Sequence, residues 1–144
     1  MKYAYCVLAL AATAGLASAA FAQEGGRPLS AHMTGAAEKP NPGDPDGAGH
    51  ASLRVNVGQN QVCYDLMVEK IDVATAAHVH KGAVGASGPP VVPMNKPGAD
   101  GKAKGCATVG ADVVKDLLAN PAGYYVNVHN GPHPGGAIRG QLSK

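Results

Sequence analysis

The chain has 144 residues, and its 12 Lys and Arg residues are nearly balanced by 10 Asp and Glu residues, so the net charge is only +2. This balance excludes the strongly basic surfaces that are typical of proteins binding nucleic acids or anionic membranes. Gly (20 residues) and Pro (11 residues) are abundant while aromatic residues make up 4% of the chain, which favours many short strands joined by turns. The length fits a single domain with one core.

The first 22 residues have the features of an export signal. Lys2 supplies the positive charge, residues 7–20 form an apolar run, and Ala20, Phe21 and Ala22 form an A-x-A cleavage motif. The run is too short and too rich in Ala for a membrane span, and Cys6 precedes it, which is not the place of a lipid-modified cysteine. We expect cleavage after Ala22, a flexible start at 23–27, a domain at 28–144, and a periplasmic or secreted location.

Export also predicts the state of the two remaining cysteines, Cys63 and Cys106. In an oxidising compartment such a pair most simply forms a disulfide. The bond would close a loop of roughly 40 residues and stabilise the fold by about 4 kcal/mol, less any strain. The alternative, a pair of thiolate metal ligands, lacks C-x-x-C spacing, so we expect the disulfide.

Alternation of apolar and polar residues predicts most of the secondary structure. We expect a first strand at 28–38, a loop at 39–49, and two strands at 50–57 and 62–71 that are joined by a hairpin turn. Further strands are expected at 75–81, 91–94 and 102–109, followed by one short helix at 111–119.

The segment YYVNVHNGPHPGGAIRGQL at 124–142 closes this series as a hairpin with one apolar and one polar face. The polar face carries His129 and Arg139, and His133 lies in the connection. The apolar face is expected to close the core through Tyr124, Val126, Val128, Ile138 and Leu142. About seven or eight short antiparallel strands and one helix predict an all-β fold, a Greek-key β-sandwich or barrel.

The sharpest chemical signal is the H-x-H pair formed by His78 and His80. On a strand such residues project from one face about 7 Å apart at their bases, so their imidazoles can reach one ion, and imidazole suits copper, zinc and nickel. An isolated pair more often only forms hydrogen bonds at a solvated surface. His129 also faces outward, so three histidines can cluster if the two strands are neighbours. His133 is either a fourth ligand or a plain turn residue.

Arg139 points the same way as His129. Beside a metal it would hold an anion; otherwise it would bond loop carbonyls or a carboxylate such as Asp65, and we favour the loop contact. His32 and His50 also face outward, without an identifiable partner, and we interpret them as surface residues. The sequence shows no nucleophile elbow and no obvious pair of active-site carboxylates, so we assign no catalytic residue and favour binding over turnover.

Two segments, HVHKGAVGASGPPVV and YYVNVHNGPHPGGAIRGQL, resemble the CHRD domain, a module named after the extracellular protein chordin and found in exported bacterial proteins. The ending typical of that family, a Y-V-N-V-H strand followed by P-x-G-x-I-R-G-Q-L, is matched almost throughout. The resemblance extends over residues 28–142. It implies a fold and a location more readily than an activity.

A fainter similarity links the histidine pattern to copper/zinc superoxide dismutase, a Greek-key barrel with copper outside its wall. It implies copper ligands at His78, His80 and His129 and an anion-guiding role for Arg139. The loop after His80 has no histidine, so the bridging ligand and the zinc site of that enzyme are missing.

Taken together, these observations predict an exported CHRD domain that binds a copper-like ion through the three histidines. The alternatives are a metal-free module that binds a protein or a polysaccharide and, third, a dismutase-like enzyme. We expect neither nucleic acid nor a membrane span after cleavage.

Overall fold

The computed structural model describes residues 26–144. The expected signal segment at 1–22 therefore lies outside the described residues. The secondary-structure elements are, in chain order, β1 (Arg27–Thr34), η1 (Gly35–Ala37), β2 (Ala48–Asn56), β3 (Gln61–Glu69), β4 (Ala74–Lys81), β5 (Pro90–Met94), β6 (Lys102–Thr108), α1 (Ala111–Ala119), η2 (Pro121–Gly123), β7 (Tyr124–Asn130) and β8 (Ile138–Gln141).

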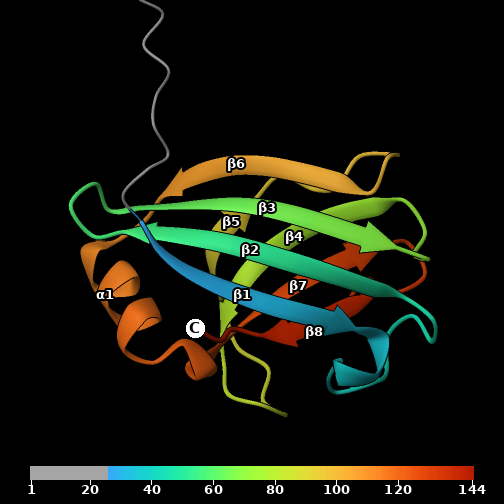
Figure 1. Ribbon diagram of the computed structural model, residues 1–144. Coiled ribbons are helices and arrows are strands. Elements are labelled where there is room, and N and C mark those ends of the chain that lie inside the picture. The colour runs from blue at the N-terminus through green and yellow to red at the C-terminus, as the bar shows by residue number, and fades with distance from the viewer. Residues whose placement is uncertain (1–25) are drawn as a thin grey trace, which may run out of the picture.

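The strands form one antiparallel sheet of 8 strands in the order β5-β4-β7-β8-β1-β2-β3-β6. The sheet curls until its edge strands β5 and β6 come close, which gives a nearly closed barrel (Figure 1). At this seam the Asn95 side chain, directly after β5, donates to the Lys104 carbonyl of β6 at 3.0 Å. Strand β7 returns to lie beside β4, which is a Greek-key connection. The all-β Greek-key fold expected from the sequence is thereby confirmed.

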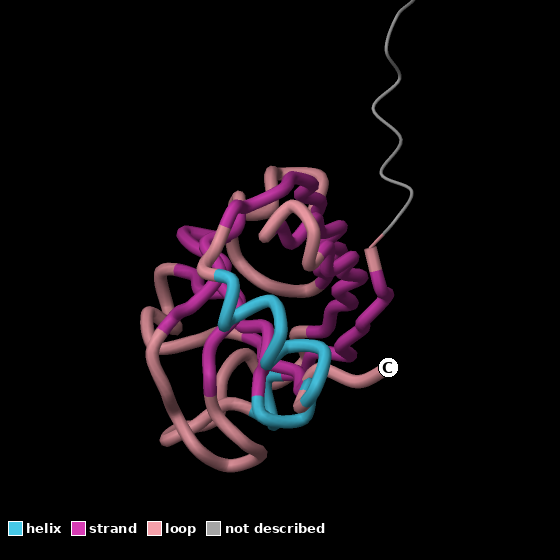
Figure 2. The backbone as a smooth tube through the Cα atoms, turned by 90° about the vertical axis from the view of Figure 1, so that its left-hand side faces the viewer, coloured by secondary structure: helices cyan, strands magenta, loops and turns pink. Residues whose placement is uncertain are grey.

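Alternate residues of the strands point into the barrel and form its core. Burial of these side chains is the main favourable term in folding, at roughly 25 cal/mol per Å² of apolar surface. The helix α1 lies across one end of the barrel (Figure 2), where it buries Val114 and Leu117. The helix follows the extended Gly110 and ends at Ala119. Asn120 caps it directly before Pro121, whose fixed φ and missing N–H oppose continuation of the helix.

The observed strand ends differ from the expected ones by a few residues. The helix spans the expected range. The largest difference is in the first strand, which ends at Thr34 instead of 38 because the chain turns into η1. Gly35 allows this turn, since a Cβ there would lie 1.8 Å from the Asp44 carbonyl oxygen. Likewise β2 begins at Ala48, inside the expected loop, because Ala48 pairs with both Thr34 and Glu69.

The cysteines confirm the expected disulfide. Cys63 on β3 and Cys106 on β6 are register partners and are joined by an S–S bond, with a sequence separation of 43 residues. The bond ties the edge strand β6 to β3. Among the described residues, no helix combines the length and hydrophobicity that crossing a membrane would require.

Candidate metal centre

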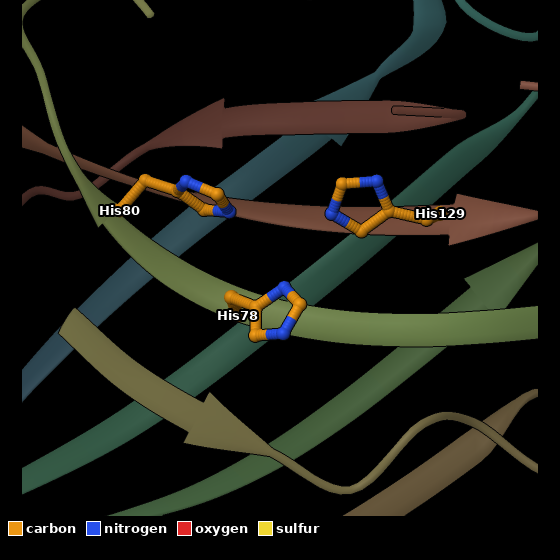
Figure 3. A group of neighbouring side chains, drawn as sticks. All are labelled: His78, His80 and His129. Carbon is orange, nitrogen blue, oxygen red and sulfur yellow. The ribbon is translucent and has the colours of Figure 1, made fainter. Parts of the chain in front are cut away.

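Strand pairing brings His78, His80 and His129 together on the outer wall of the barrel. His78 and His80 lie on β4 and His129 lies on β7, and β4 and β7 are hydrogen-bonded neighbours. Ala76 is the register partner of His129, so His129 is diagonal to His78. The ring centroid of His78 lies 5.4 Å from that of His80 and 5.4 Å from that of His129. The centroids of His80 and His129 are 6.1 Å apart. Figure 3 shows one nitrogen of each ring turned toward the space between the rings.

Backbone carbonyls determine which ring nitrogens are available. His80 Nδ1 lies 2.9 Å from the Gly88 oxygen, and His129 Nδ1 lies 3.0 Å from the Pro134 oxygen. A carbonyl only accepts, so each Nδ1 carries the proton and each Nε2 keeps its lone pair. These two Nε2 atoms and His78 Nδ1 are buried and have no hydrogen-bond partner. Three potential ligand atoms thus face one small space that is shielded from solvent.

The spacing of the rings is close to that of a metal site. One nitrogen of each histidine lies within 4.8 Å of the others. At a metal–nitrogen distance of about 2.0–2.1 Å, two nitrogens on the same ion are at most about 4.2 Å apart. A small rotation of the half-buried rings about their side-chain torsions would therefore bring all three into range.

Burial keeps two of these rings neutral. It is the main cause that lowers the pKa of His78 below 6.5, and the neighbouring His129 and His80 rings lower this pKa further. The pKa of His80 is lowered by burial as well, against an opposing effect of its hydrogen bond to Gly88. Only a neutral imidazole can bind a metal, so both rings are in the ligand state at neutral pH.

Tyr125, on the same strand as His129, and Arg139, on the neighbouring β8, support the cluster. The Tyr125 ring stacks on His80 with centroids 4.9 Å apart and an interplanar angle of 10°. The Arg139 guanidinium, only 2% exposed, lies 3.4 Å from the Tyr125 centroid and donates to the Ala83 carbonyl at 3.1 Å. Arg139 therefore holds the loop 82–89, whereas Asp65, the carboxylate considered from the sequence, pairs with Lys104.

A buried carboxyl, that of Glu38, lies close enough to Arg139 to interact with its charge. Glu38 is 2% exposed, and Asn127 Nδ2 donates to its Oε1 at 2.5 Å. Burial raises the pKa of Glu38 to about 7, although the nearby Arg139 charge acts in the opposite direction. Sequence reasoning missed Glu38 because it lies 89 residues from Asn127 and at the end of a presumed strand. Tyr125 could have been found from the sequence, because it is an aromatic residue on the polar face of its strand.

His133 does not join the cluster, which among the described residues comprises His78, His80 and His129 alone. Its backbone N–H donates to Asn130 Oδ1 at 2.8 Å, as expected of a turn residue. It lines a hollow of about 320 Å³ that also includes Glu38.

The fold and site define an antiparallel barrel with a histidine cluster on its outer wall. The chain belongs to the CHRD domain family, whose model matches residues 29–142. Comparisons with curated proteins and with solved structures found no match. Family membership and the disulfide fit an extracellular or periplasmic location. The copper ligands and the anion-guiding arginine that the similarity to superoxide dismutase implies stay predictions.

Proposed function

We propose that this protein is an exported CHRD-domain protein that binds a copper-like metal ion through His78, His80 and His129. The observation that carries the proposal is the convergence of three ring nitrogens that are buried and have no partner. Each buried polar atom left without a hydrogen bond costs about 1–3 kcal/mol. One shared ion would satisfy all three at once.

The donor set favours copper. Neutral imidazole nitrogens suit copper, zinc and nickel, and affinities of divalent ions for such sites generally reach their maximum at Cu²⁺. The carbonyls of Gly88 and Pro134 hold the opposite nitrogens of two rings, which is the arrangement that orients metal-binding histidines. Three protein ligands would leave a further coordination position for water or another donor.

The proposal is metal binding or handling, not turnover. An anion-guiding arginine must present its guanidinium to the solvent. Arg139 instead stacks on Tyr125 and bonds the Ala83 carbonyl, with 2% of its surface exposed. A dismutation rate no faster than that of free copper is therefore the expected outcome of an activity assay.

The test is the EPR spectrum of the protein with one equivalent of Cu(II). Coupling to histidine nitrogen is expected in the wild type, and it should weaken in His129→Ala and largely disappear when His78→Ala and His80→Ala are combined. His133→Ala is the matched control and should leave the spectrum unchanged, because His133 is outside the cluster. A wild-type spectrum without nitrogen coupling, or one unaffected by the double replacement, would end the proposal.

A further inference from the structure

A second group of metal-binding side chains lies in one row across three neighbouring strands. His32 on β1 is the register partner of His50 on β2, and His50 is the register partner of Met67 on β3. Side chains that oppose each other in this way have Cβ atoms about 4.5–5.5 Å apart. All three point outward, because the residues next to them in sequence, such as Ala31, Ala51 and Leu66, are buried in the core.

The central residue of the row offers a free ligand atom. The His32 and His50 rings lie 4.8 Å apart between centroids. His50 Nε2 is 3.2 Å from Ser52 Oγ, while His50 Nδ1 is buried and has no partner. The Ser52 hydroxyl can donate as well as accept, so this contact allows either tautomer of His50. In the tautomer that donates Nε2–H to Ser52, Nδ1 keeps a lone pair that nothing satisfies. His80 and His129 of the first cluster likewise have one hydrogen-bonded ring nitrogen and one buried ring nitrogen without a partner.

Met67 completes the row with a sulfur donor. Its side chain is 56% exposed although it lies within a strand, so it is not there to fill the core. An open hollow of about 450 Å³ is lined by Met67 together with His32, His50 and Glu69. The exposed Glu69 lies two residues after Met67 on the same face and adds a negative charge. Lys102, opposite Met67 on β6, is exposed.

We propose that His32, His50 and Met67 form a second metal site that takes a soft monovalent ion, Cu(I). A thioether is a soft donor that favours Cu(I), while the two imidazoles suit copper in general. Thiolates do not compete in the described part of the chain, because Cys63 and Cys106 are joined as a disulfide.

The second site is independent of the first. It lies on the outer face of the layer formed by β1, β2 and β3, in front in Figure 1, whereas the first lies on the outer face of β4 and β7, behind it. The barrel core separates the two faces. Ligands of one site can therefore be removed without touching the other, and the second site does not depend on the function proposed above.

The test follows the methionine methyl groups by NMR during titration with Ag(I). Ag(I) is a stable substitute for Cu(I) that needs no reductant, so the disulfide stays closed. The full chain is labelled with ¹³C-methyl methionine and carries Cys6→Ser to remove the remaining thiol; Met67→Leu assigns the signal. We expect the Met67 methyl signal to shift and to saturate at one equivalent, while the signals of the buried Met33 and of Met94 stay in place.

Three variants and a second metal ion decide the outcome. Replacing both His32 and His50 by Ala should weaken the Met67 response at least tenfold, and His32→Gln serves if that double variant does not fold. The combination of His78→Ala and His80→Ala should leave the response intact. Zn(II) should not move the signal. An unmoved Met67 signal, an unchanged response without His32 and His50, or an equal response to Zn(II) would overturn the proposal.

Discussion

At the scale of single residues, the Nδ1–H groups of His80 and His129 each donate a hydrogen bond to a backbone carbonyl. This fixes Nε2 as the nitrogen whose lone pair is available. The proton competes with a metal for the same lone pair. Because the pKa of His78 and of His80 is below the ordinary 6.5, this competition begins only at lower pH than for an exposed histidine. His78 and His80 therefore keep these lone pairs free of protons down to a lower pH than an exposed histidine does.

Glu38→Gln should change how stability depends on pH. The native pKa of Glu38 is raised from 4.5 to about 7, so between these values the folded state keeps a proton that the unfolded state releases. Stability from this group is present below about pH 4.5 and is lost as pH rises to about 7. One pKa unit corresponds to about 1.4 kcal/mol, so the shift from 4.5 to about 7 sets an upper bound of about 3.5 kcal/mol on this effect.

The measurement is urea denaturation of Glu38→Gln and wild type at pH 5 and pH 8. The variant, which cannot ionise, should gain stability relative to the wild type at the higher pH. Glu69→Gln, at an exposed position, should stay within about 0.5 kcal/mol of the wild type. A difference between Glu38→Gln and wild type that is the same at both pH values would contradict the raised pKa.

Arg139→Ala should destabilise the protein by about 2–4 kcal/mol, because it removes a buried cation–π contact and a charged hydrogen bond to the loop 82–89. The free energy of unfolding from denaturant titration measures the loss. Arg54→Ala, at an exposed position on β2, is the control and should cost no more than about 0.5 kcal/mol. Equal effects of the two replacements would show that Arg139 has no structural role.

At the scale of elements, the short strand β8 connects the two halves of the sheet. It pairs with β7 over several residues. Its pairing with β1 consists of one residue pair, Thr34 and Arg139. A Cβ at Gly140 would lie 2.1 Å from the His32 carbonyl oxygen, a backbone atom that cannot move aside cheaply. Glycine at this position therefore allows β1 to approach β8.

Gly140→Ala should accordingly destabilise the barrel by about 3 kcal/mol or more, since the clash is with backbone in the interior of the sheet. Thermal unfolding followed by circular dichroism provides the measurement. Gly135→Ala is the matched control, because a Cβ there meets nothing within 4 Å, and its effect should be at most about 1 kcal/mol in either direction. If both variants melt together with the wild type, the close approach is not required.

At the scale of the whole molecule, a ligand that binds only the folded barrel must stabilise it. With free Zn(II) at 100 times its dissociation constant, the gain should be about 2.7 kcal/mol, seen as a higher melting temperature. Zn(II) suits the imidazole donors and undergoes no redox change. The gain should vanish when His78→Ala and His80→Ala are combined and persist in His133→Ala. A gain that survives the double replacement would place the bound ion elsewhere.

Much of the fold follows from local sequence patterns. The helix at 111–119 and the strand around His78 and His80 were predicted because periodicity depends on neighbouring residues alone. The shared face of the H-x-H pair follows from the strand period of two. The end of β1 was not predictable in this way, because it is set by the contact of Gly35 with Asp44 across a loop.

The sequence by itself determined the family, the disulfide partners and the outward direction of the five histidines that lie on strands. Only the tertiary structure decided which of these side chains meet. It placed β7 beside β4, which completes the cluster with His129, and it aligned His32, His50 and Met67 across β1, β2 and β3. The physical reason is that the pairing and register of separate strands are selected by burial of the whole core, whereas periodicity records only which face of a strand each residue occupies.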